Sequence, residues 1–169
     1  PKYNIEFEDG KIYTHPVGGA ANVVDLDSNV VRPSTLKDVE NLTKIVDSLP
    51  NIHTQTMIVY PSDIPKSLRD IYAVEATIRN TGKNFDATPF TDDSFQFIIK
   101  MAETLVGEEE LRKNPIITCS ASPTSPLQFS AEVTKIMTRA AKHNLPIAVL
   151  PCPLAGAASP VTLSGTLVQ

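Results

Sequence analysis

The chain has 169 residues, of which 41% are hydrophobic and 20% are charged, and its formal net charge is −4. These values are typical of a globular domain with its own core, and they exclude disordered and fibrous classes. Acidic and basic residues are interspersed, so we expect no nucleic-acid partner. No run approaches the roughly 20 apolar residues of a membrane span and no secretory signal opens the chain, which predicts a cytoplasmic protein without a membrane partner.

Residues 1–32 are predicted to form an N-terminal extended segment that contains a β-hairpin. Two extended runs, at 11–14 and 20–26, are followed by a polar turn at 27–29 and a short return at 30–31. Extended runs separated by such turn residues are the usual pattern of a hairpin. We therefore expect this hairpin to precede the main domain, which begins at Pro33.

From Pro33 onward, apolar runs bounded by turn residues alternate with amphipathic helical patterns. A helix is predicted from about 35 to 49, because Thr35 and Asp38 have the spacing of a capping box ahead of an apolar stripe. The later elements are strands at 52–59, 84–88, 115–121 and 146–151, helices at 65–80, 91–106 and 128–143, a short turn at 108–113, and a final helix N-capped by Ser159. The strands begin about every thirty residues, the length of one βα unit, so the sheet is predicted to be parallel.

Residues 33–169 are therefore predicted to form part of a parallel (β/α)8 TIM barrel, with about four to five βα units. The doubly wound parallel fold is the competing architecture, and the pattern separates the two weakly. No GxGxxG or GxxxxGKS/T motif follows a strand, which argues against a nucleotide-binding version. Four units cannot close an eight-stranded barrel and the chain stops at Gln169 within an apolar pattern, so we expect it to be truncated at the C-terminus.

In parallel βα proteins the ligand meets the loops that follow the strands, so those loops are the first candidates for a site. Here they are rich in Pro, small hydroxyls, Ala and Gly, and they carry two aromatic residues and few charges. Tyr60 and Phe90 predict either an aromatic wall for a quaternary ammonium or simple packing. The hydroxyls of one loop predict either ligand contacts or helix caps, and they are Ser120, Ser122, Thr124 and Ser125.

The cysteines, the histidines and two aspartates are candidates for a catalytic or ligand-binding role, and each also has a structural explanation. Cys152 lies between two prolines with no base nearby, so burial as a small hydrophobe is favoured over a nucleophile, and no CxxC spacing links it to Cys119. The histidines lack metal-ligand spacing, so we predict no directly bound metal and treat His53, at the entrance of a strand, as structural. Asp63 and Asp86 are candidates for an acid, a base or a ligand, with helix capping favoured for Asp63.

Three segments resemble the trimethylamine methyltransferase family. They are Arg32-Pro33-Ser34-Thr35-Leu36-Lys37-Asp38, then Tyr60-Pro61-Ser62-Asp63-Ile64-Pro65 leading to Leu68-Arg69-Asp70, and Pro153-Leu154-Ala155-Gly156-Ala157-Ala158-Ser159-Pro160-Val161-Thr162-Leu163 with Gly165-Thr166-Leu167. The third segment is the most specific. Gly107-Glu108-Glu109 and Ser122-Pro123 with Ser125-Pro126-Leu127 fall in the expected order, so the likeness covers nearly the whole chain.

The resemblance implies a (β/α)8 barrel enzyme that moves a methyl group from a methylated amine to Co(I) of a cobalamin carried by a partner corrinoid protein. In the trimethylamine branch the catalytic residue is pyrrolysine, on a later strand than any present here, whereas the larger branch without it acts on quaternary amines such as glycine betaine. We expect the glycine betaine-type branch and, at full length, a homo-oligomer. The catalytic residues are left unassigned.

The resemblance also assigns roles to residues of the loops. Tyr60 and Phe90 would cage the cation, and Ser122 and Thr124 would bind the polar end of the substrate. One loop would face the corrin or the substrate, through Cys152, Ala155, Gly156 and Ser159.

Two alternatives remain open at this point. A different barrel enzyme, such as an aldolase or a dehydratase, would usually show a Lys or a set of metal-binding carboxylates at strand ends, but Lys100 and Lys135 fall on predicted helices. A non-catalytic barrel that binds a quaternary amine or a partner protein is the second alternative. We expect the chain by itself to be inactive, because it lacks further strands and leaves sheet edges open.

Overall fold

The computed structural model describes residues 5–6, 8–124 and 128–168, and a four-stranded parallel sheet lies at its centre. The strands are β3 (Thr54–Thr56), β4 (Asn84–Ala87), β5 (Ile117–Ala121) and β6 (Ile147–Val149), and each pairs with the next along the chain. Thr56 lies opposite Asp86, and Ser120 lies opposite Ala148. The predicted parallel βα alternation is confirmed, with shorter strands than predicted. The arrangement is compatible with part of a βα barrel.

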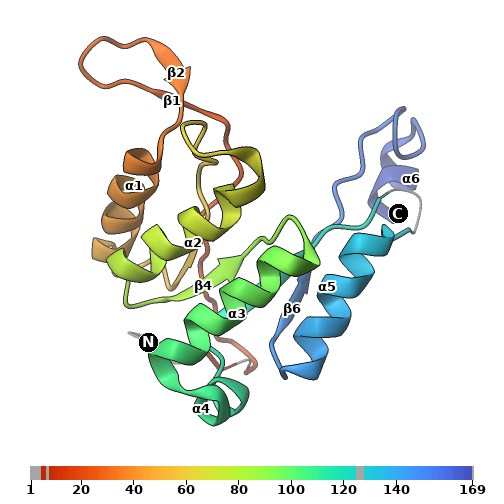
Figure 1. Ribbon diagram of the computed structural model, residues 1–169. Coiled ribbons are helices and arrows are strands. Elements are labelled where there is room, and N and C mark those ends of the chain that lie inside the picture. The colour runs from red at the N-terminus through yellow and green to blue at the C-terminus, as the bar shows by residue number, and fades with distance from the viewer. Residues whose placement is uncertain (1–4, 7, 125–127, 169) are drawn as a thin grey trace.

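Helices cover one face of this sheet. The helices in the described part of the chain are α1 (Leu36–Ser48), α2 (Arg69–Asn80) after a short 3-10 turn (Lys66–Leu68), α3 (Asp92–Val106), α4 (Glu108–Lys113), α5 (Ala131–Lys142) and α6 (Leu163–Val168). Helices α2, α3 and α5 lie across the sheet, and α1 packs beside α2 (Figure 1). Phe95 and Ile98 of α3 pack against Phe85 and Ile117 of the sheet, and none of the four is more than 4% exposed. Burial of these side chains fixes the helices on this face.

Local capping signals place several helix ends where the sequence predicts them. The Asp38 carboxylate accepts a 2.8 Å hydrogen bond from the Thr35 backbone N–H, which completes the capping box of α1. Thr91 caps α3, and Gly107 ends it with a positive φ of 88°. Asn144 takes the left-handed conformation, with φ 56°, after α5.

Two predicted helix starts are wrong. Helix α5 begins at Ala131 because Ser130 Oγ accepts from Val133 N–H, whereas Gln128 pairs with Thr124 through backbone hydrogen bonds. The last helix begins at Leu163, and Thr162 Oγ1 accepts from Gly165 N–H, so Ser159 is not its N-cap.

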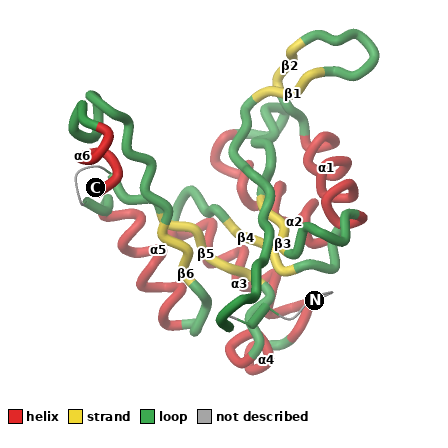
Figure 2. The backbone as a smooth tube through the Cα atoms, turned by 180° about the vertical axis from the view of Figure 1, so that it is seen from behind, coloured by secondary structure: helices red, strands yellow, loops and turns green. Residues whose placement is uncertain are grey.

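The predicted hairpin is present, but it is shorter than predicted. Strand β1 (Asn22–Val24) pairs antiparallel with β2 (Val31–Pro33), and the run at 11–14 is not a strand. Instead, residues 14–20 run alongside the free edge of β3, where His53 N–H donates to the Thr14 carbonyl at 3.1 Å and Gly19 N–H donates to the Met57 carbonyl at 3.0 Å. Seen from behind, this segment passes along the sheet on the side away from the helices (Figure 2).

Candidate functional site

The sheet face that carries no helix is polar. Side chains alternate along each strand, so Phe85 and Ala87 of β4 and Ile117 and Cys119 of β5 point towards the helices. The alternate residues of β3, β4 and β5 face the other side of the sheet, the open face, which is turned towards the viewer in Figure 2. These residues are Thr54, Thr56, Asn84, Asp86, Thr118 and Ser120. A polar face on a central sheet is unusual for a packed core and typical of a ligand site.

Asp86 is the acidic group of this open face. Ser120 Oγ, from the neighbouring strand, donates a 2.5 Å hydrogen bond to Asp86 Oδ2. Asp86 Oδ1 is buried and accepts no hydrogen bond from the described residues. Burial raises the pKa of the Asp86 carboxyl, while the Ser120 hydrogen bonds and the charge of His15 act in the opposite direction. Asp86, which the sequence offers as a candidate acid, base or ligand, thus has Ser120 as a hydrogen-bond partner.

Tyr60 and Phe90 form an aromatic pair at the ends of two neighbouring βα units. Their ring centroids are 5.3 Å apart with an interplanar angle of 55°. Tyr60 is half-buried, and burial raises the pKa of its hydroxyl, with further contributions from the Asp86 and Asp70 carboxylates. The structure brings together the two aromatic residues that the sequence analysis selected.

Hydrogen bonds from two of the segments that carry the family resemblance hold this aromatic pair. Ser34 Oγ donates to the Tyr60 carbonyl at 2.6 Å. Phe90 N–H donates to Asp70 Oδ2 at 2.7 Å, and Ser94 Oγ donates to the same oxygen at 2.5 Å. Ser34 and Asp70 are both buried, at 0% and 1% exposure. Each aromatic residue is thus fixed by a buried polar side chain from the start of a preceding helix.

Gly19 of the N-terminal segment lies against the ring of Tyr60. Its φ is +90°, and a Cβ at this position would be 3.5 Å from the Tyr60 ring. A positive φ of this size favours glycine over residues with a side chain. The second glycine of the Gly18-Gly19 pair therefore allows the backbone to approach the aromatic ring.

The remaining predicted site residues are more dispersed. Ser122 and Thr124 are exposed, and the backbone of Thr124 pairs with Gln128 rather than capping a helix. Ser125 lies outside the described residues. Of the four hydroxyl residues, the structure therefore pairs Ser120 with the Asp86 carboxylate.

Cys152 is exposed, so its predicted burial is wrong, and Cys119 is the buried cysteine of the two. Burial raises the pKa of the Cys119 thiol to about 12, which makes it a poor nucleophile. The loop after β6 forms a turn, in which Gly156 N–H donates to the Ser159 carbonyl at 3.0 Å. Ala155 and Gly156 on this turn are exposed.

Asp63 caps helix α1 rather than helix α2, which follows Asp63 in the sequence. Asp63 Oδ1 accepts a 2.9 Å hydrogen bond from Leu36 N–H at the start of α1. His53 Nδ1 accepts a 3.0 Å hydrogen bond from Thr14 N–H, which agrees with the structural role predicted for it. Among the residues that the structure describes, no group of three or more His, Cys, Asp or Glu is placed to hold a metal ion.

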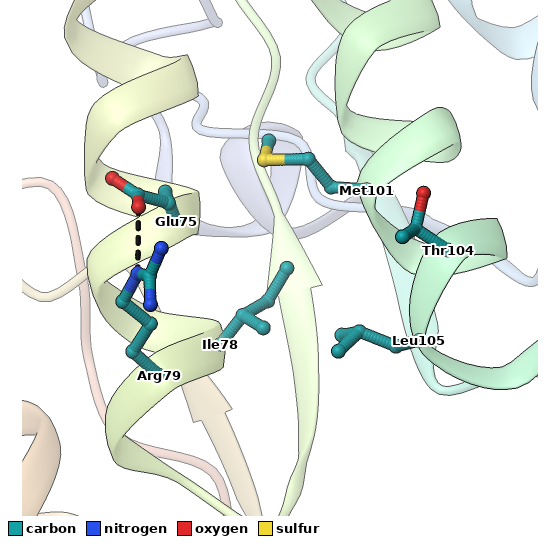
Figure 3. A pocket seen from close by; sticks show the side chains of 6 residues that line it. All are labelled: Glu75, Ile78, Arg79, Met101, Thr104 and Leu105. Atoms are coloured by element: carbon teal, nitrogen blue, oxygen red, sulfur yellow. Dashed lines mark hydrogen bonds and ion pairs between the residues drawn. The ribbon is translucent and has the colours of Figure 1, made fainter.

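An apolar groove of about 280 Å³ lies elsewhere, between α2 and α3. Ile78, Met101 and Leu105 line it, and the Glu75–Arg79 ion pair lies at its side (Figure 3). These residues belong to the C-terminal halves of the two helices, which lie at the amino ends of the parallel strands. That end contributes stability in βα proteins, so the groove is not the candidate site.

No helix in the described part of the chain is long and apolar enough to cross a membrane.

The fold and the site together define a parallel βα-repeat protein whose candidate ligand site is an open polar sheet face beside an aromatic pair. A sequence model of the trimethylamine methyltransferase (MTTB) family matches residues 1–169, and the chain belongs to this family.

Several curated proteins are similar to this chain. A trimethylamine methyltransferase MttB of Desulfitobacterium hafniense is 29% identical over 99% of this chain and 34% of its own length. A trimethylamine methyltransferase MttB of Methanosarcina barkeri is 31% identical over 80% of this chain and 28% of its own length. A glycine betaine methyltransferase of Desulfitobacterium hafniense is 24% identical over 99% of this chain and 35% of its own length. The chain therefore spans about a third of the length of these relatives.

Proposed function

We propose that the chain is part of a (β/α)8 barrel methyltransferase that moves a methyl group from a methylated tertiary or quaternary amine to Co(I) of a corrinoid held by a partner protein. Family membership supports the methyltransferase class. The observation that carries the amine is the Tyr60–Phe90 pair, whose ring centroids are 5.3 Å apart, together with the Asp86 carboxylate, which helps to raise the pKa of the Tyr60 hydroxyl. Aromatic faces and a carboxylate are the groups that attract an ammonium ion.

The proposed methyl transfer does not require a general acid or a general base. The amine leaves as a neutral molecule from a positively charged substrate, because the electron pair of the broken C–N bond stays on nitrogen. A nucleophilic His or Cys is not required for this step, which suits the burial of Cys119. The task of these residues would be to orient the methyl group and exclude water, a positioning effect.

A bound corrinoid would supply the Co(I) nucleophile that accepts the methyl group. The residues that would meet it are those of the exposed turn after β6, around Cys152, Ala155, Gly156 and Ser159. Gly156 has φ +76°, and exposed small side chains at Ala155 and Ala157 permit close approach by a large flat group. This fit supports the cofactor assignment and the partner protein that carries it.

The amine itself has two candidates. Glycine betaine is the substrate expected from the resemblance, and one relative carries that substrate in its name. Trimethylamine is named for the relatives of 29–31% identity. Tyr60 and Phe90 suit both amines, because both present a methylated cation. Ser122 and Thr124 would matter only for a substrate with a carboxylate, such as glycine betaine.

The experiment is an anoxic assay of the full-length protein that contains this chain, mixed with its corrinoid partner reduced to Co(I). Methylation of the corrinoid, followed by absorbance, is measured against a panel of methylated amines and betaines. We expect at least one methylated amine to methylate the corrinoid. Binding of an amine without methylation would favour the non-catalytic barrel, and neither binding nor methylation by any amine would contradict the proposal.

A further inference from the structure

Backbone hydrogen bonds tie the N-terminal segment to the stretch of chain that ends at Tyr60. Gly19 N–H donates to the Met57 carbonyl at 3.0 Å. Ala20 N–H donates to the Ile58 carbonyl, also at 3.0 Å, and the Ala20 carbonyl accepts from Tyr60 N–H at 2.9 Å. The backbone at Tyr60 is therefore held by a segment that lies far from it in the sequence.

Gly18 allows this segment to lie directly against the chain before Tyr60. A Cβ at position 18 would be 2.7 Å from the Met57 carbonyl oxygen and 2.9 Å from Thr56 Cγ2. Rotation of a side chain does not relieve a contact with a backbone oxygen, so one of the two segments would have to move. The φ of Gly18 is not in the left-handed region. Close approach of the two backbones is therefore the reason for glycine at this position.

Glycine at position 19 has a different cause. Its φ is +90°, which disfavours residues with a side chain. A Cβ at this position would be 3.5 Å from Tyr60 Cε2 and 3.7 Å from Tyr60 Oη, which are ordinary contact distances. The turn at Gly19 thus brings the backbone to the hydroxyl-bearing edge of the Tyr60 ring, and the Phe90 ring lies 5.3 Å from the same ring.

We propose that Gly18 and Gly19 are positioning residues, which hold the Tyr60 ring where it binds the methylated ammonium ion together with Phe90. This inference rests on the proposed function, and it adds the N-terminal segment to the amine site. The attraction between a cation and a ring falls as the ring moves away from the cation. A ring that is free to move must also be ordered again when the ligand binds, which costs affinity.

The test measures the Kd of trimethylamine and of glycine betaine by calorimetric titration of the full-length protein. We expect Gly18→Ala to weaken binding about 5- to 30-fold, as much as Tyr60→Ala, because the displaced segment no longer fixes the ring. The double variant Gly18→Ala, Tyr60→Ala should bind within about 2-fold of Tyr60→Ala alone, because a residue that acts through the ring has no effect once the ring is absent. A structural role unconnected with the ring would give additive losses.

Gly19→Ala and Gly10→Ala form a matched pair. Both glycines have a positive φ, +90° and +82°, so alanine strains the two backbones alike. Gly10 has no atom within 4 Å of the position of a Cβ, whereas Gly19 lies against Tyr60. We expect Gly19→Ala to weaken amine binding about 3- to 10-fold and Gly10→Ala to bind normally.

Circular dichroism establishes that each variant is folded. If Gly18→Ala does not fold, the comparison of Gly19→Ala with Gly10→Ala decides, because a Cβ at position 19 meets Tyr60 at an ordinary contact distance. Normal binding by the glycine variants while Tyr60→Ala binds weakly, or additive losses in the double variant, would overturn the inference and leave the aromatic cage intact. Normal binding by Tyr60→Ala, or no binding by the unaltered protein, would instead contradict the amine site of the proposed function, and the inference with it.

Discussion

Ser34 Oγ donates a 2.6 Å hydrogen bond to the carbonyl of Tyr60, and this contact links a family-like segment to the aromatic pair. The Ser34 carbonyl in turn accepts from the Ser62 N–H and hydroxyl, both at 2.7 Å. Ser34 is completely buried, so its hydroxyl is shielded from water. The start of α1 is therefore tied to the loop that presents Tyr60.

Replacing Ser34 with Ala should destabilise the full-length protein by about 2 kcal/mol, because the carbonyls of Tyr60 and Ala21 lose the donor that the buried Ser34 hydroxyl provides. The free energy of unfolding in urea is the measurement. Ser48→Ala, which removes an exposed hydroxyl bonded to the Ile45 carbonyl, is the control and should cost about 0.5 kcal/mol or less. Equal losses for the two variants would contradict the importance of the Ser34 contact.

Lys83 holds the end of α1 in the same way. Its buried ammonium donates to the carbonyls of Val46 at 2.5 Å, Leu49 at 2.8 Å and Ile52 at 2.5 Å. Lys83→Met should destabilise the protein by about 3 kcal/mol, because these carbonyls lose a charged donor in a buried place. Urea unfolding measures the loss. Lys113→Met, at an exposed position, should leave the free energy of unfolding within about 0.5 kcal/mol of its original value.

The Arg32–Asp38 pair predicts how stability depends on pH. Two hydrogen bonds join the guanidinium to the Asp38 carboxylate, at 2.7 and 2.9 Å, and they hold the pKa of Asp38 well below its ordinary value of 3.8. A lowered folded-state pKa means that the pair stabilises the fold above pH 3.8 and that this contribution is lost as the pH falls towards the folded pKa.

Arg32→Gln should therefore lower the free energy of unfolding at pH 7, and the loss should shrink as the pH is lowered below 3.8. Urea unfolding at a series of pH values is the measurement. Arg79→Gln, which removes the exposed Glu75 pair, should cost about 0.5 kcal/mol or less at pH 7. A cost for Arg32→Gln that stays constant down to pH 2 would show that packing of the side chain, rather than its charge, is responsible.

The aromatic pair predicts a loss of affinity for methylated ammonium ions. Tyr60→Ala and Phe90→Ala should each weaken binding about 5- to 30-fold, the equivalent of a desolvated cation–π contact of about 1–2 kcal/mol. Tyr60→Phe keeps the ring and should stay within about 3-fold of the original affinity. Calorimetric titration of the full-length protein measures each Kd. Tyr72→Ala, on an exposed part of α2, is the control, and affinities unchanged by both ring deletions would remove the cage from the proposal.

Much of the fold could be predicted because its signals are local. The capping box of Thr35 and Asp38 depends on residues close in sequence and is as predicted. The N-cap at Thr91 and the left-handed Asn144 are local in the same way, and they bound the start of α3 and the end of α5 close to the predicted positions. The start of α5 was misplaced because the segment before it pairs with itself, Thr124 with Gln128, before Ser130 caps the helix. A helix that starts at Gln128 and a helix that starts at Ala131 both satisfy the local preferences of Ser and Thr for hydrogen bonds to nearby backbone, so the sequence does not distinguish them.

The open sheet face could have been recognised in part. The sequences Asn84-Phe85-Asp86-Ala87 and Thr118-Cys119-Ser120-Ala121 alternate polar and apolar residues, which is the pattern of strands with one polar face. The sequence-based expectation for ligand contacts falls instead on the loops that follow the strands. The family resemblance names Ser122 and Thr124 of one such loop for the substrate, whereas the structure pairs Ser120 with Asp86.

The sequence by itself determined the alternation of strands and helices, the helix caps and the family, because each depends on short-range patterns or on ordered motifs along the chain. Tertiary structure alone decided that Asp86 meets Ser120 across 34 positions, that residues 14–20 follow the edge of β3, and that Cys152 is exposed. The Asp86–Ser120 contact depends on strand register and on which face each strand turns to the helices, and the other two depend on how loops pack against distant parts of the chain. A one-residue shift in register would invert every one of those faces, and no local signal fixes it.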